Sequence, residues 1–215
     1  MFRGLTRPST LLLGVALSAS CATSSCKCGT EPSRASSGAP SLRLYVLSSV
    51  AGAIEPCGCV KDMQGGADHA AAFINSQKQA APHALLLGAG PMLFMNARPD
   101  AARDAQASFK ADALADAFKS LGLSAWAPGA NDWLLGEETL AKLARRSGAS
   151  LLAANLNSPS VRQTKVLELS GIKVGLVGVS MPVFAGKSPQ AVEASDPGVA
   201  AQNALAELGK GGAQL

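Results

Sequence analysis

Histidine and aromatic residues are scarce in this sequence. It contains two histidines, and aromatic residues make up 4% of its 215 positions. Two histidines are too few for a hydrolytic metal site of the His-rich kind. Charged residues are also few, at 16%, and the 19 Lys and Arg that outnumber 15 Asp and Glu are spread along the chain without a basic block. We therefore expect no nucleic-acid partner.

Long apolar runs are missing as well. The apolar run at 11–17 is much shorter than the roughly 20 residues needed to span a bilayer. Nevertheless, 47% of the residues are hydrophobic, which is a globular composition rather than a disordered one. We therefore expect one sizeable core, in a domain of α/β size.

The first 20 residues have the pattern of an export signal. Arg3 and Arg7 precede the apolar run, and the small residues 18–20 follow it, directly before Cys21. The segment 17–21 resembles the signal of bacterial lipoproteins, in which the cysteine is lipidated and becomes the new N-terminus; here Ser18 stands where that family prefers Leu. Ordinary signal cleavage nearby is the alternative. The resemblance implies a lipid anchor at Cys21 and a location in the bacterial periplasm or cell envelope.

A second segment, 21–40, is rich in Ser, Gly, Pro and Thr and has no apolar period, which is typical of a flexible tether. The five cysteines stand at positions 21, 26, 28, 57 and 59. If Cys21 carries the lipid, the others form two Cys-x-Cys pairs in a compartment that permits disulfides. The sequence thus predicts a signal peptide at 1–20, a lipidated tether at 21–40 and a folded domain at 41–215.

Within the domain, strand and helix patterns alternate. Apolar, β-rich runs predict strands at 42–48, 83–87, 124–127, 149–153, 164–169 and 172–179, with the last two joined as a hairpin. Helical spacing or capping residues predict helices at 67–79, 108–121, 137–146 and 196–208. This order predicts a layered α/β fold. Residues 209–215 stand where such a domain would begin its next strand, so we expect a truncated domain.

Four stretches of the domain resemble the N-terminal half of the 5'-nucleotidase branch of the calcineurin-like metallophosphoesterases. They are LRLYVLSSVAGAIEPCGC (42–59) with Gly65-Gly66, HALLLGAGPMLF (83–94), KADALADAFKSLGLSAWAPGANDWLLG (110–136), and LLAANL (151–156) with GIKVGLVGVSMP (171–182) and Asp196-Pro197. The resemblance implies a layered sandwich with a mixed central sheet. It also implies strand tips that hold two metal ions, about 3.5–4 Å apart, to activate a water.

The residues at the family's metal-binding positions lack the side chains that hold those ions. In the family's Gly-Asn-His-Asp/Glu motif, Gly129 and Asp132 match. The other positions hold Ser49 and Ala51 for Asp-x-His, Pro91 for the bridging aspartate, Ala130 for the asparagine and Asn131 for the catalytic histidine. Hard metal ions need carboxylate, amide or imidazole donors that this set does not supply. We therefore expect no phosphoesterase activity of the family's usual kind.

A thiol pair follows the first predicted strand, in the run Glu55-Pro56-Cys57-Gly58-Cys59. This run resembles a bacterial subgroup of exported nucleotidase-like proteins, some of which carry selenocysteine within it. Two thiols separated by one glycine can bind a soft ion such as Cu(I) or Zn(II), close a readily reduced disulfide, or form structural disulfides with Cys26 and Cys28. The spacing leaves these alternatives open.

Other polar residues are candidates to act with the thiol pair. His69 follows the Gly-Gly pair and could serve as a third ligand, although a single helical histidine is more often a surface residue. Glu55 and Asp132 could support the thiols by hydrogen bonds. Asn131 and Asp132 are equally well explained as ordinary turn residues.

We predict an exported, membrane-anchored lipoprotein whose nucleotidase-like fold has lost its metal ligands. In this prediction, Cys57 and Cys59 carry out thiol redox chemistry or bind copper or zinc. The partners would be a membrane, through the lipid, and a thiol or small molecule. One alternative is a non-catalytic binding or scaffold lipoprotein that uses the old cleft, and another is residual phosphoesterase activity.

Overall fold

The computed structural model describes residues 42–56, 58, 61, 63, 65–81, 83–96, 102–181 and 192–215. The predicted signal peptide, the tether, Cys21, Cys57 and Cys59 lie outside the described residues. The elements are β1 (Arg43–Ser48), α1 (Gly66–Ala80), β2 (Ala84–Gly90), α2 (Asp104–Leu121), β3 (Leu123–Pro128), η1 (Ala130–Trp133), α3 (Glu137–Ser147), β4 (Ser150–Leu151), β5 (Leu156–Asn157), β6 (Thr164–Leu169), β7 (Ile172–Val177), β8 (Glu193–Ala194) and α4 (Pro197–Lys210).

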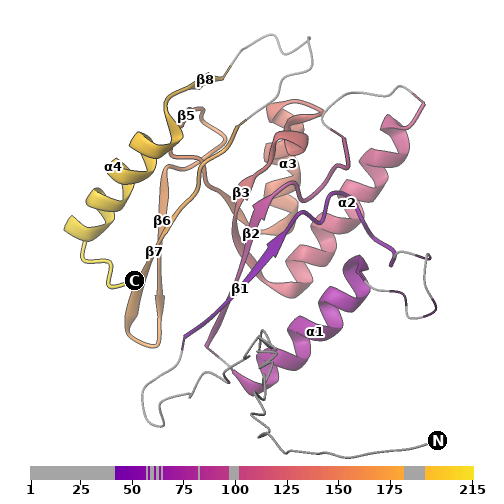
Figure 1. Cartoon of the computed structure of the whole chain (residues 1–215), viewed down its shortest axis with the longest axis horizontal. Helices are drawn as coiled ribbons and strands as arrows, with labels where there is room; N and C mark the ends of the chain where they lie inside the picture. The colour runs from indigo at the N-terminus through magenta and orange to yellow at the C-terminus, as the bar shows by residue number, and fades with distance from the viewer. Residues whose placement is uncertain are drawn as a thin grey trace, which may run out of the picture. The chain divides into compact units, whose positions relative to one another are not determined.

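A four-stranded parallel sheet with the order β1-β2-β3-β4 forms the centre of the fold. Each strand lies beside the one before it in the chain, and a helix connects each pair. Crossovers between parallel strands are right-handed, so a sheet built in sequence order places all its connecting helices on one face. Figure 1 shows α1, α2 and α3 together on one side of the sheet.

The opposite face of the sheet carries the antiparallel β6–β7 hairpin, with α4 packed on the outside of the hairpin (Figure 1). A second antiparallel pair joins β5 to β8. The predicted layered α/β fold is therefore confirmed. Strand directions are parallel within the central sheet and antiparallel in the two small sheets.

Two apolar cores hold these layers together, and the central strands contribute to both. Leu86 and Trp126 point toward the helices, into the larger core. Their neighbours Leu85 and Ala125 point toward the hairpin, into the smaller core. Successive residues of a strand face opposite sides of its sheet, so apolar runs such as 84–87 mark strands covered on both faces.

The predicted helix ends agree with the structure where a capping residue marks them. The Asp196 side chain accepts a hydrogen bond from the Val199 backbone N–H at 2.8 Å, as expected of a helix N-cap. Gly122 ends α2 with a φ of 71°, the left-handed conformation that favours glycine. Without such a marker, α2 begins four residues before the predicted start at 108.

None of the helices in the described segments combines the length and the hydropathy that a membrane span requires.

Candidate functional site

The loops after β1, β2 and β3 meet at one edge of the sheet, because the carboxyl ends of parallel strands lie side by side. Backbone hydrogen bonds join the first two loops. The Ala51 N–H donates to the Pro91 carbonyl at 3.0 Å, and the Gly52 N–H donates to the Met92 carbonyl at 3.3 Å. The two loops to which the resemblance assigns the family's first two groups of ligands are therefore neighbours.

The loop after β3 packs directly against the loop after β2. A Cβ atom built on Gly129 would stand 2.2 Å from the Pro91 backbone nitrogen, far inside the contact distance. Only a residue without a side chain allows this approach. The contact brings Ala130 and Asn131 to the same edge of the sheet as Pro91.

The loop after β1 has an uncommon backbone conformation at two of these positions. Ser49 has a φ of 54° and Ala51 a φ of 49°, both in the left-handed region. A residue with a Cβ atom pays about 1 kcal/mol or more to adopt this region. The loop thus keeps a strained shape although Ala51 carries no functional group.

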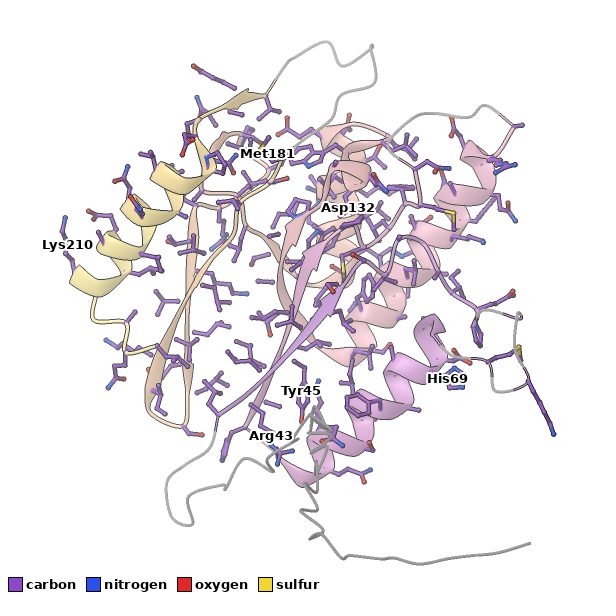
Figure 2. The ribbon with its side chains drawn as sticks, in the orientation of Figure 1. Arg43, Tyr45, His69, Asp132, Met181 and Lys210 are labelled. Carbon is purple, nitrogen blue, oxygen red and sulfur yellow. The ribbon has the colours of Figure 1, made fainter. Side chains whose placement is uncertain are left out.

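Asp132 ties the loops together from within the fold. Its side chain is 1% exposed, and Figure 2 shows it near the ends of the strands. One carboxylate oxygen accepts from the backbone N–H groups of Met92 and Leu93 at 2.9 and 2.8 Å, and the other accepts from the Gly129 N–H at 3.0 Å. Asp132 therefore fixes the loop after β2 against the loop after β3.

Burial raises the pKa of Asp132 from its ordinary value of 3.8 to about 6, because the charged form has lost its hydration. The hydrogen bonds from Leu93, Met92 and Gly129 act in the opposite direction, since they favour the carboxylate. Burial has the larger effect. Asp132 consequently holds a proton over a pH range in which an exposed aspartate would be ionised.

Asn131, which the resemblance places where the family has its catalytic histidine, holds the backbone of a neighbouring loop. Its side-chain amide donates to the carbonyl of Phe94 at 3.2 Å and to that of Met95 at 2.7 Å. The described hydrogen bonds of Asn131 and Asp132 thus go mainly to the loop after β2. An amide nitrogen engaged in this way positions the loop and carries no proton-transfer chemistry.

A second buried polar cluster, which the sequence interpretation did not single out, joins η1 to the end of β3 and to the segments that follow β4 and β7. The Ser180 hydroxyl donates to the Pro128 carbonyl at 2.6 Å and accepts from the Trp133 indole N–H at 3.0 Å. The Asn155 amide donates to the Ser180 carbonyl at 2.8 Å, and the Ser180 N–H donates to the Asn155 side-chain oxygen at 2.9 Å. The sequence held one signal for this cluster: Asn155 and Ser180 each end an apolar run, LLAAN and GLVGVS.

His69 and Glu55 do not join Asp132. The His69 ring nitrogen Nδ1 lies 2.9 Å from the Gly65 carbonyl oxygen and 3.7 Å from an Asp68 carboxylate oxygen. Figure 2 shows His69 near the start of α1, well separated from Asp132. Glu55 is exposed.

Metal-binding groups are absent from the part of the chain that the structure describes: no three His, Cys, Asp or Glu side chains gather there into a group that could hold an ion. Ser49, Pro91 and Ala130 contribute at most one hydroxyl between them. This donor set does not fit the pair of hard metal ions that the fold family's hydrolytic chemistry uses.

No protein-family model and no curated protein sequence matches this chain. Several solved structures are similar to it. The 5'-nucleotidase precursor from Thermus thermophilus superposes with a TM-score of 0.67 and 22% identity, over 80% of this chain and 35% of that one. The NAD nucleotidase from Haemophilus influenzae gives a TM-score of 0.66 and 17% identity, over 80% of this chain and 32% of that one.

A calcineurin-like phosphoesterase from Bacillus subtilis is also similar, with a TM-score of 0.62 and 15% identity, over 81% of this chain and 60% of that one. These likenesses show that the chain has the fold of the calcineurin-like phosphoesterases. The chain spans about a third of the length of the two nucleotidases.

Proposed function

We propose that this chain is an exported lipoprotein in which a metallophosphoesterase-like fold has replaced hydrolytic metal chemistry with thiol chemistry at Cys57 and Cys59. The observation that carries this proposal is the composition of the strand edge. The loops after β1, β2 and β3 meet there, but Ala51, Pro91 and Ala130 have no donor atoms in their side chains. Cys57 and Cys59 follow in the stretch of chain after β1.

The surroundings of the thiol pair support binding of a soft metal ion. Gly58, between the two cysteines, has the Met63 sulfur beside it, since a Cβ built on Gly58 would stand 3.9 Å from Sδ. Two thiolates and a thioether are the donors that Cu(I) prefers. Zinc binds thiolates but gains less from a thioether.

The chain directly before Cys57 packs on the start of α1. Pro56, directly before Cys57 in the chain, packs so closely on the first residue of α1 that a Cβ on Gly66 would stand 2.7 Å from the Pro56 nitrogen. The Ala67 N–H donates to the Ile54 carbonyl at 2.9 Å. The positive end of a helix dipole lowers the pKa of a nearby thiol and so favours the thiolate that binds metal or exchanges with a disulfide.

Elemental analysis with thiol counting tests the proposal. The full-length protein is compared with Cys57→Ser/Cys59→Ser and with the matched control Cys26→Ser/Cys28→Ser. We expect near-stoichiometric copper or zinc in the first and third proteins and none in the second. A metal-free protein whose Cys57 and Cys59 exchange readily with a small disulfide would indicate redox chemistry instead. Metal-free protein with inert thiols would contradict the proposal.

Lipid attachment has its own test. In a bacterial host, Cys21→Ser is expected to move the protein from the membrane fraction to the soluble fraction and to abolish incorporation of labelled palmitate. Cys26→Ser, a few positions later in the tether, should leave both unchanged. Equal behaviour of the two variants would contradict lipidation at Cys21.

A second candidate function is non-catalytic binding in the old cleft. The observation that favours it is the set of buried polar groups devoted to holding the loops, among them Asp132, Asn155 and Ser180. This function predicts nucleotide binding that persists in Cys57→Ser/Cys59→Ser. Calorimetric titration with a nucleoside monophosphate separates it from the thiol proposal.

A further inference from the structure

The ring of His69, at the start of α1, has the hydrogen bond that is typical of a metal-binding histidine. Its Nδ1 lies 2.9 Å from the Gly65 carbonyl oxygen, which can only accept, so Nδ1 carries the hydrogen of the neutral ring. The lone pair is then on Nε2, the other ring nitrogen. Histidines that bind metal ions commonly donate from one nitrogen to a backbone carbonyl and bind the ion with the other.

The first turn of α1 carries both His69 and the packing contact of the chain before the thiol pair. A Cβ atom on Gly66 would stand 2.7 Å from the Pro56 nitrogen and 2.8 Å from the Glu55 carbonyl carbon. Helical side chains point toward the N-terminus of their helix, so the His69 ring lies over this turn and 54% of its side chain is exposed. Figure 2 shows His69 at this end of the helix.

Met63 brings a thioether to the glycine that separates the two cysteines. Its sulfur would stand 3.9 Å from a Cβ atom on Gly58. The Met63 residue is 51% exposed, and it belongs to neither apolar core of the described segments. Methionine in a folded domain usually fills gaps in a core. Packing therefore does not account for a methionine at this place.

These two side chains come close to the thiol pair along the chain and in space. The two cysteines lie outside the described residues, but their covalent neighbours Pro56 and Gly58 are described. Pro56 contacts the turn that carries His69, and Gly58 contacts Met63. One imidazole and one thioether are therefore available to the segment that holds the thiols.

We propose that this site binds Cu(I), with Nε2 of His69 and the sulfur of Met63 as ligands in addition to Cys57 and Cys59. The inference rests on the proposed function, because it completes the site of the thiol pair and names its ion. Thiolates and thioethers are soft donors that select Cu(I), and imidazole also suits copper. The thioether distinguishes copper from zinc, since zinc sites are built from thiolates, imidazoles and carboxylates.

X-ray absorption at the copper edge tests the ligands directly. The full-length protein is produced with selenomethionine and loaded with Cu(I) in the presence of a reductant. We expect a selenium neighbour of copper that is lost in Met63→Leu and kept in the matched control Met95→Leu, since Met95 is another exposed methionine. We also expect an imidazole neighbour that is lost in His69→Gln and kept in His83→Gln, at the other histidine of the chain.

Competition with a Cu(I) chelator measures the contribution of each ligand. Met63→Leu and His69→Gln are each expected to bind Cu(I) at least about tenfold more weakly than the parent protein. Met63→Leu should leave the affinity for Zn(II) unchanged. Both side chains are exposed, so we expect the variants to fold, and their unfolding midpoints provide the check.

The same measurements distinguish a failure of this inference from a failure of the proposed function. Equal Cu(I) affinity in Met63→Leu and Met95→Leu, or in His69→Gln and His83→Gln, would overturn the ligand assignment. A parent protein that binds zinc but no copper would overturn the choice of ion. In both cases the proposed function stands if Cys57→Ser/Cys59→Ser loses the metal. Copper that stays bound in this double variant would contradict the proposed function itself.

Discussion

The carboxylate of Asp132 links two loops through hydrogen bonds from their backbones. Its two oxygens accept from different loops, Leu93 N–H on one side and Gly129 N–H on the other. The amide of asparagine cannot accept on both sides, because one of its two ends carries hydrogens. The residue next to it, Asn131, anchors the same loop further along by donating to Met95.

Asp132→Asn should therefore destabilise the protein. Above pH 7, where the parent carboxylate is ionised, the NH₂ group of asparagine faces a backbone N–H in either orientation, which leaves a buried donor without an acceptor. We expect the free energy of unfolding to fall by about 2 kcal/mol, measured by urea denaturation. The control is Asp196→Asn at the start of α4, since asparagine caps a helix as well as aspartate does. A loss of equal size in both variants would contradict the role assigned to Asp132.

The raised pKa of Asp132 predicts a pH dependence of stability. Between its ordinary value of 3.8 and about 6, the folded protein holds a proton that the unfolded chain has released. The free energy of unfolding should therefore fall as pH rises through this window, by about 3 kcal/mol in total. Thermal unfolding at a series of pH values measures it, and Asp132→Asn should lack this component. A parent protein whose stability instead rises from pH 4 to 6 by more than the variant's would contradict the assignment.

At the scale of elements, the contact between the loops after β2 and β3 depends on one glycine. Gly129→Ala would place a methyl group 2.2 Å from the Pro91 nitrogen, so the two loops would have to separate. We expect a loss of at least about 2 kcal/mol in the free energy of unfolding, by urea denaturation.

The control for this prediction is Gly209→Ala, inside α4, where an added Cβ meets nothing within 4 Å. Alanine is the better helix former, so this variant should gain about 0.5–1 kcal/mol. If Gly129→Ala were as stable as the parent protein, the loops would not be in the contact described.

The elements themselves were largely predictable from the sequence, because their signals are local. Apolar runs marked β2 and β3, and Asp196 and Gly122 marked helix ends. The short β5–β8 pair was not predicted, since each strand has only two residues and their pairing spans a long stretch of chain. The link from Trp133 to Ser180 was missed for the same reason, as no local pattern indicates a hydrogen bond between residues 47 positions apart.

At the scale of the whole molecule, the comparisons show the fold and leave the chemistry to the proposal. The chain has the fold of the phosphoesterases, and it spans about a third of the two nucleotidases' length. The residues that the resemblance assigns to the family's ligand positions lie in loops that meet at one sheet edge. The sequence could not show what now holds this edge together, because the hydrogen bonds of Asp132 and Asn131 depend on loop contacts distant along the chain.

We expect no hydrolysis of a generic phosphodiester by this chain, with or without added Mn²⁺ or Zn²⁺. The control is Asn131→His, which restores one side chain of the family motif and should remain inactive, because Ala51 and Pro91 still supply no ligands. The measurement is release of p-nitrophenol over hours at high protein concentration. Metal-dependent turnover that Asn131→His increases would contradict the loss of the site.

Tryptophan fluorescence can report on the loop after β3. Trp126 and Trp133 are its only two tryptophans; they flank the loop after β3, and both are buried. Their emission should be that of indoles shielded from water, and it should shift to longer wavelength when the chain unfolds. Since the Trp133 indole N–H donates to Ser180 in the segment after β7, a ligand or ion that displaces either neighbouring loop would be visible in the fluorescence of the unlabelled protein.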